Sequence, residues 1–188
     1  MFWPRVSEVY RPDSPLTVVD ELPNEQYEGW GYSLAMLKDG NGNDVPPWGN
    51  TAIFRIFEGG MTEPVYVNKP ELTARFTVNV LAGSGILIRA LASGAVEKLP
   101  MNEGDEFIIT PGQAYSYVNA SEKDSDNDLI LHDVAMPAFR ADDEIKLMAC
   151  RVDISDYPTV LRPDGRELNL AKRFYDLVFQ ACAGRLVH

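Results

Sequence analysis

Proton transfer near neutral pH is the chemistry that a histidine side chain does best, and this chain has only two histidines, His132 and the terminal His188. His132 lies in DLILHDVAM (128–136), an alternating run typical of a strand. In a strand either His132 or Asp133 can face the interior, but not both, because successive side chains point to opposite faces. We therefore treat His132 as a candidate general acid or base, with a structural histidine beside an aspartate as the alternative.

The other charged candidates are two arginines within apolar runs. Arg55 in TAIFRIF (51–57) and Arg75 in ARFTVNVL (74–81) could contact an anionic group of a ligand. The chain as a whole is acidic, with 28 acidic and 17 basic residues and a net charge of −11, so nucleic acid and anionic lipid are disfavoured as partners. Cys150 and Cys182 have no metal-ligand or CxxC spacing and are expected to be free thiols.

The elements that must position these residues are short strands. From residue 51 onward, runs of β-branched and aromatic residues recur about every ten residues, each bounded by Gly, Pro, Asn or Asp. They are TAIFRIF (51–57), VYVN (65–68), ARFTVNVL (74–81), GILIRAL (85–91), EFIIT (106–110), AYSYVN (114–119) and DLILHDVAM (128–136). This spacing predicts an all-β sandwich or barrel.

The two ends of the chain have a different pattern. Residues 1–50 contain six prolines and predict an irregular N-terminal arm with one or two short strands, such as GWGYSLAML (29–37). Residues 51–140 form the predicted barrel, and residues 141–188 form a C-terminal extension. That extension is expected to contain a helix from residue 165 onward, with Asp164 as its N-cap and Gly184 at its C-terminal end. A chain of 188 residues is expected to fold as a single domain.

The stretch EGDEFIITPGQAYSYVN (103–119) carries a motif with fixed offsets. Its positions are Gly104, Thr110 beside Pro111, Gly112, Tyr115 and Asn119. Gly112 can adopt a positive φ in the turn, and Asn119 can bond backbone at the end of the strand. This pattern resembles the second motif of the cupin family, in which a histidine stands where this chain has Tyr115. The resemblance implies a cupin-like jelly-roll barrel, and MPAFRADDEI (136–145) is similar to the segment that closes many such barrels.

The same resemblance implies that the metal site of the family has been lost. Counting back from Gly83 places Lys69 and Glu71 at the two histidine positions of the first motif and Phe76 at its glutamate position. With Tyr115 these side chains are a poor set of ligands for a transition metal. We expect no metal and no other cofactor.

The residues at these positions would instead line a mostly apolar interior. Tyr115 implies that Tyr117 also faces inward, and Phe76 brings Val78 with it, while Lys69 and Glu71 would lie nearer the mouth. On this view Tyr115, His132, Glu71 and Lys69 are candidate catalytic residues, and the candidate substrate contacts are Phe76, Val78, Tyr117, Arg55 and Arg75. Core packing of the rings and a surface ion pair between Lys69 and Glu71 are the alternatives.

The functional expectation is a metal-independent cyclase or isomerase acting on a hydrophobic small metabolite. A non-catalytic small-molecule-binding module and a nucleotide-sugar epimerase or ketoisomerase are the alternatives. We expect no nucleic acid partner and no membrane association, a homodimer, and a cytoplasmic location because residues 1–13 lack the pattern of a secretory signal.

Overall fold

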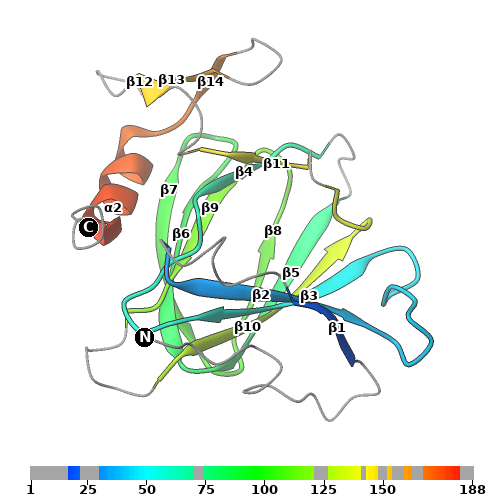
Figure 1. Cartoon of the computed structure of the whole chain (residues 1–188). Helices are drawn as coiled ribbons and strands as arrows, with labels where there is room; N and C mark the ends of the chain where they lie inside the picture. Colours follow the sequence, from blue (N-terminus) through cyan, green and yellow to red (C-terminus); the bar gives the residue numbers. More distant parts are fainter. Residues whose placement is uncertain are drawn as a thin grey trace.

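The fold is built from two antiparallel sheets that face each other, with a helix at one side (Figure 1). The computed structural model describes residues 17–21, 30–69, 74–120, 127–140, 143–147, 152–153, 159–161 and 167–182. These features confirm the prediction of an all-β, jelly-roll type of barrel with a C-terminal helix.

Each sheet has a simple strand order. The six-stranded sheet runs β1 (Thr17–Glu21), β2 (Tyr32–Lys38), β3 (Asn50–Ile56), β10 (Leu129–Met136), β5 (Arg75–Ala82) and β8 (Glu106–Ile109). The five-stranded sheet runs β11 (Glu144–Lys146), β4 (Val65–Val67), β9 (Ala114–Val118), β6 (Ser84–Ala90) and β7 (Val96–Asn102). A separate three-stranded sheet consists of β12 (Val152–Asp153), β13 (Thr159–Leu161) and β14 (Glu167–Asn169).

The main core lies between the two large sheets, as the alternation of side chains along the strands requires. Its buried members come from both sheets and include Ile56, Phe76, Val78, Val80, Leu87, Tyr115, Tyr117, Leu129 and Leu131. The alternate residues of the six-stranded sheet, such as Ala35, Leu37, Ile53 and Ile130, form a smaller cluster on its opposite face. This division decides which strand residues can reach the interior of the barrel.

Helix α2 (Lys172–Cys182) covers the outer face of the five-stranded sheet. Phe174, Tyr175 and Val178 of the helix join Ile88 of β6 in a buried cluster. The helix begins later than the sequence predicts, because residues 167–169 instead form β14, which pairs with β13. The expected caps Asp164 and Gly184 lie outside the described residues.

The turn and strand end of the 103–119 motif have the expected conformations. Gly112 has a φ of 84°, a region that residues with a Cβ rarely adopt. The Asn119 amide donates hydrogen bonds to the backbone oxygens of Ile56 at 2.9 Å and Asn127 at 3.0 Å. Asn119 therefore joins the end of β9 to the end of β3, and both structural predictions for this motif are confirmed.

The barrel sheets extend beyond residues 51–140. Strand β2 pairs with β3 along most of its length, so the six-stranded sheet includes part of the range predicted as an arm. At the other end β11 pairs with β4 and adds residues 144–146 to the five-stranded sheet. Strand β7 is an edge strand that the sequence analysis did not predict, because VEKLPMN contains Pro100 and charged residues. No helix in the described part of the chain has the length and apolar character needed to cross a membrane.

Candidate functional site

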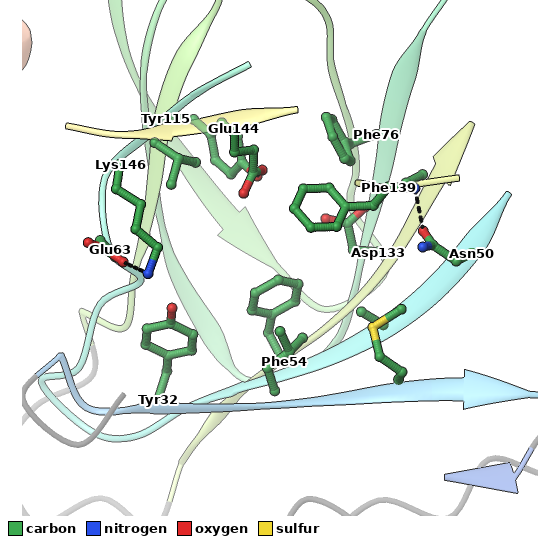
Figure 2. Close-up of a pocket in the computed structure, with 15 residues that line it drawn as sticks. Tyr32, Asn50, Phe54, Glu63, Phe76, Tyr115, Asp133, Phe139, Glu144 and Lys146 are labelled. Atoms are coloured by element: carbon green, nitrogen blue, oxygen red, sulfur yellow. Dashed lines mark hydrogen bonds and ion pairs between the residues drawn. The ribbon is translucent and has the colours of Figure 1, made fainter. Parts of the chain in front are cut away.

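A cavity of about 300 Å³ opens between the two sheets (Figure 2). Its walls are largely aromatic and aliphatic, and the rings are Tyr32, Phe54, Phe76, Tyr115 and Phe139. The polar side chains that line it are Asn50, Glu63, Asp133, Glu144 and Lys146. The volume is at the lower end of the range for small-molecule pockets, so the cavity fits a compact ligand.

A short polar contact of the cavity joins two strands of the five-stranded sheet that are separated by a third. The Tyr115 hydroxyl on β9 donates a hydrogen bond of 2.5 Å to Oε1 of Glu144 on β11, and strand β4 lies between these two strands. Figure 2 shows Tyr115 and Glu144 together on the same wall of the cavity. This length is typical of a charge-assisted hydrogen bond to a carboxylate.

Burial changes the protonation behaviour of both groups. It raises the pKa of Glu144 from 4.5 to about 7, while the hydrogen bond from Tyr115 acts in the opposite direction. Nearby Asp143 and Glu63 also raise this pKa by charge repulsion. Burial, together with the charge of Glu144, raises the pKa of the Tyr115 hydroxyl well above 10. Near neutral pH, Glu144 therefore exchanges a proton easily, whereas Tyr115 stays protonated and acts as a donor.

Asp133 is a second carboxyl group in the cavity, on the six-stranded sheet. It lies on the central strand β10, between Ala52 of β3 and Val78 of β5, and its residue surface is 6% exposed. Its Oδ1 atom is buried and has no hydrogen-bond partner among the described residues. Burial, followed by repulsion from Glu144, raises the pKa of Asp133 well above 3.8, which favours the neutral acid.

The mouth of the cavity carries an ion pair and an exposed ring. Lys146 on β11 lies 2.9 Å from Glu63, and the lysine side chain is half exposed. Phe139 is also partly exposed, and its backbone amide donates a hydrogen bond of 3.1 Å to the Asn50 side chain. These residues mark the side of the cavity that faces solvent.

The prediction that Lys69 lies near the mouth is wrong. Its side chain instead forms a buried ion pair and buried hydrogen bonds. Its side chain is 1% exposed, and its ammonium lies 2.7 Å from Oδ2 of Asp143. It also donates hydrogen bonds of 3.1 Å to the backbone oxygens of Pro137 and Ala138. Lys69 therefore holds the segment that carries Phe139 against the start of β11, and it does not line the cavity.

His132 is on the wrong face of its strand for the predicted catalytic role. It pairs with Ile53 and Asn79, whereas its neighbours Leu131 and Asp133 face the interior. The register of β10 thus resolves the alternative that the sequence left open. Burial lowers the pKa of His132, so the side chain is neutral near pH 7.

The two arginines are also outside the cavity lining. Arg55 forms an ion pair with Asp128, and its guanidinium lies 5.0 Å from the centre of the Phe57 ring. Arg75 is exposed at the first position of β5. The structure therefore does not support either residue as a substrate contact.

Of the five remaining predicted residues, two line the cavity, two belong to the core, and one lies outside the described residues. Phe76 and Tyr115 line it. Val78 and Tyr117 face the same interior but belong to the packed core, and the Tyr117 ring centre lies 5.1 Å from that of Tyr115. Glu71 lies outside the described residues.

The described side chains of the cavity do not form the metal site that is typical of cupins. In the part of the chain that the structure describes, no group of three or more His, Cys, Asp or Glu side chains is placed to hold a metal ion. The described positions that the resemblance compares with metal ligands carry the Phe76 ring, the Tyr115 phenol and the buried Lys69 ammonium. None of these is a good ligand for a divalent metal near neutral pH.

The most important site residues missed by the sequence analysis are Asp133 and Glu144. An aspartate between apolar residues of a central strand is a signal for Asp133, but the period of two leaves its face undetermined. Glu144 lies in a strand of three residues, too short to give a periodic pattern. Its position follows from pairing with β4, nearly eighty residues earlier in the chain.

Comparisons with known proteins give a fold likeness but no family assignment. No family model matches the sequence. No curated protein matches it either. Similar solved structures include a variant of PAC13 from Streptomyces with uridine, with a TM-score of 0.45, 15% identity, and coverage of 77% of this chain and 90% of that chain.

Two other similar structures come from different organisms. KdgF from Halomonas sp. has a TM-score of 0.46 and 16% identity, and the match covers 66% of this chain and 90% of that chain. Oxalate decarboxylase from Lactobacillus farciminis, in a formate complex, has a TM-score of 0.48 and 16% identity, with coverage of 62% of this chain and 31% of that chain. At these identities the likeness concerns the fold alone.

Proposed function

We propose that this protein is a metal-independent enzyme that moves protons on a small, largely apolar molecule held in the cavity, as an isomerase or a cyclase does. The observation that carries the proposal is the 2.5 Å hydrogen bond between Tyr115 and Glu144 in a cavity walled by aromatic rings. An acid–base group in water-poor surroundings is the arrangement that proton-transfer catalysis requires.

Each part of the site has a role in this reaction. Glu144, with a pKa of about 7, takes a proton from the ligand as the carboxylate and returns it as the acid. Tyr115 orients Glu144 and keeps its pKa from rising further, because the hydrogen bond stabilises the charged form. The rings of Phe54, Phe76 and Phe139 hold the ligand against the carboxyl and exclude water.

The nucleotide-sugar alternative is less well supported. A diphosphate needs several cationic contacts, and the one basic side chain in the described lining is Lys146, which already pairs with Glu63. The carboxyls of Glu63, Asp133 and Glu144 in the same lining would repel phosphate groups to the extent that they are ionised.

The experiment that tests the function is hydrogen exchange with solvent. The purified protein is incubated in D₂O with a panel of small neutral carbonyl compounds and olefins, and product formation and deuterium gain are followed by mass spectrometry. We expect at least one compound to rearrange or to gain deuterium with the wild type, and the rate to fall at least a hundredfold in Glu144→Gln.

A suitable control is His132→Gln, which alters a residue on the outer side of β10 and should keep the wild-type rate. Compounds that bind without exchange or product would contradict the enzymatic proposal and favour a non-catalytic binding module.

A further inference from the structure

Asp133 has no assigned role in the proton transfer described above, yet it is the most deeply buried acid of the cavity wall. Its residue surface is 6% exposed, and its Oδ1 atom has no hydrogen-bond partner among the described residues. A buried polar atom without a partner costs roughly 1–3 kcal/mol. Such a group in a folded protein needs an explanation, and a functional role is one of them.

The surroundings of Asp133 favour the protonated acid. Burial raises its pKa well above 3.8, and the neighbouring charge of Glu144 acts in the same direction. On its own sheet the nearest inward-facing side chains are apolar, namely Val78 directly across on β5 and Ala135 two positions along β10. A neutral carboxylic acid in such a setting donates a hydrogen bond, and a carboxylic acid kept neutral can stabilise a developing oxyanion.

The two carboxyl groups enter the cavity from opposite sheets. Asp133 comes from β10 in the six-stranded sheet and Glu144 from β11 in the five-stranded sheet. In Figure 2 the Asp133 carboxyl lies beside Phe76 and Phe139, while Glu144 lies next to Tyr115 on the facing wall. A ligand between the sheets can therefore touch both groups at once with different atoms.

From this arrangement we propose that the ligand is a small, neutral carbonyl compound whose oxygen accepts a hydrogen bond from Asp133 while the adjacent carbon faces Glu144. The inference rests on the proposed function and names its substrate class. The cavity of about 300 Å³ holds on the order of ten non-hydrogen atoms at the density of liquid water.

The reaction that follows is a balanced proton shift. The Glu144 carboxylate takes a proton from the carbon next to the carbonyl, and the C–H electron pair moves into a new carbon–carbon double bond as the carbonyl oxygen becomes negative. Hydrogen bonding from the Asp133 acid stabilises that oxygen. In a substrate with a β,γ carbon–carbon double bond, protonated Glu144 then returns the proton to the γ carbon, which restores the carbonyl and moves the double bond next to it.

The test uses three probes of matched size, namely acetophenone, ethylbenzene and 1-phenylethylamine. Their dissociation constants are measured by calorimetry for the wild type, Asp133→Asn and Asp133→Leu. We expect acetophenone to bind about tenfold more tightly than ethylbenzene to the wild type, because one hydrogen bond is added. Asp133→Asn should retain this preference because an amide still donates, whereas Asp133→Leu should abolish it.

Two results would overturn the inference. One is equal binding of acetophenone and ethylbenzene to the wild type. The other is preferential binding of the 1-phenylethylamine cation that is lost in Asp133→Asn, because Asp133 would then act as an anion for an amine.

The two proposals can fail separately. If ketone selectivity depends on Asp133 but no compound gains deuterium, the proposed catalytic activity is refuted. The proposed hydrogen bond from Asp133 to a carbonyl oxygen is then retained. If deuterium exchange depends on Glu144 but Asp133→Leu does not change ketone selectivity, the proposed hydrogen bond from Asp133 to the carbonyl oxygen is refuted. The proposed catalytic activity is then retained. Thermal unfolding of each variant confirms the fold, and Asp133→Leu is expected to be at least as stable as the wild type because it removes an unpaired buried acid.

Discussion

Tyr115 donates its hydroxyl hydrogen to Oε1 of Glu144 at 2.5 Å, and this bond connects the central strand β9 to the edge strand β11 across β4. The bond opposes the effect of burial on the carboxyl, whose pKa is nevertheless raised to about 7. The proposed proton transfer depends on the resulting pKa of Glu144. This pKa can be measured without knowing the substrate.

The raised pKa of Glu144 makes the stability of the protein depend on pH. The folded state binds this proton more tightly than the unfolded state, where the pKa is close to the ordinary 4.5. The contribution of Glu144 to stability is therefore fully present below about pH 4.5 and is lost as pH rises through about 7, by up to about 3 kcal/mol.

Glu144→Gln should remove this dependence, since an amide does not titrate. The free energy of unfolding is measured for both proteins by urea denaturation between pH 4.5 and 8. As pH rises, the wild type should lose stability relative to the variant. A difference that stays constant over this range would contradict the raised pKa.

Tyr115→Phe should raise the pKa of Glu144 further, because it removes a hydrogen bond that stabilises the carboxylate. The midpoint is read from the ¹³C carboxyl resonance of Glu144 in a pH titration. The loss of stability should be about 1 kcal/mol. Tyr66→Phe is the control, because Tyr66 packs against the cluster on the outer face of the five-stranded sheet and is not among the groups that shift the Glu144 pKa. Equal midpoints in both variants would show that the hydrogen bond has no such role.

Lys69→Met should destabilise the fold by about 3–5 kcal/mol, because it leaves Asp143 buried without its charged partner. Chemical denaturation measures this loss. Lys172→Met breaks an exposed ion pair with Asp176 on α2 and should change stability by less than about 0.5 kcal/mol. Similar small effects of both substitutions would mean that the Lys69 contacts contribute little.

His132→Gln should leave the binding of acetophenone unchanged, because the side chain lies on the opposite face of β10 from the cavity. The same calorimetric titration measures it. A tenfold or larger weakening in a variant that remains folded would show that His132 reaches the ligand, against the register of the sheet.

The sequence predicted those parts of the fold that depend on local signals. Strands bounded by Gly, Pro, Asn and Asp were found, and the conformation of Gly112 and the backbone contacts of Asn119 follow from the requirements of a turn and a strand end. Alternation within a strand also placed Phe76 and Tyr115 on the interior face, once the motif had fixed which face that was.

The parts that could not be predicted depend on long-range pairing. Whether His132 or Asp133 faces inward is decided by the register of β10 against β3 and β5, and a shift of one residue would exchange them. Glu144 reaches the cavity only because a three-residue strand pairs with β4. Lys69 was expected at the mouth from its position in the first motif of the cupin resemblance, and nothing in its local sequence indicates Asp143 as its partner.

The two cavity acids differ in the number of strands paired with the strand that carries them. Asp133 is held by paired neighbours on both sides, Ala52 and Val78, in the middle of a sheet. Glu144 sits on a short outermost strand whose one paired neighbour at that position is Val67. Asp133 is therefore positioned by backbone pairing on both sides, whereas Glu144 depends on the pairing of β11 with β4 and on the buried Lys69–Asp143 contact at the start of that strand.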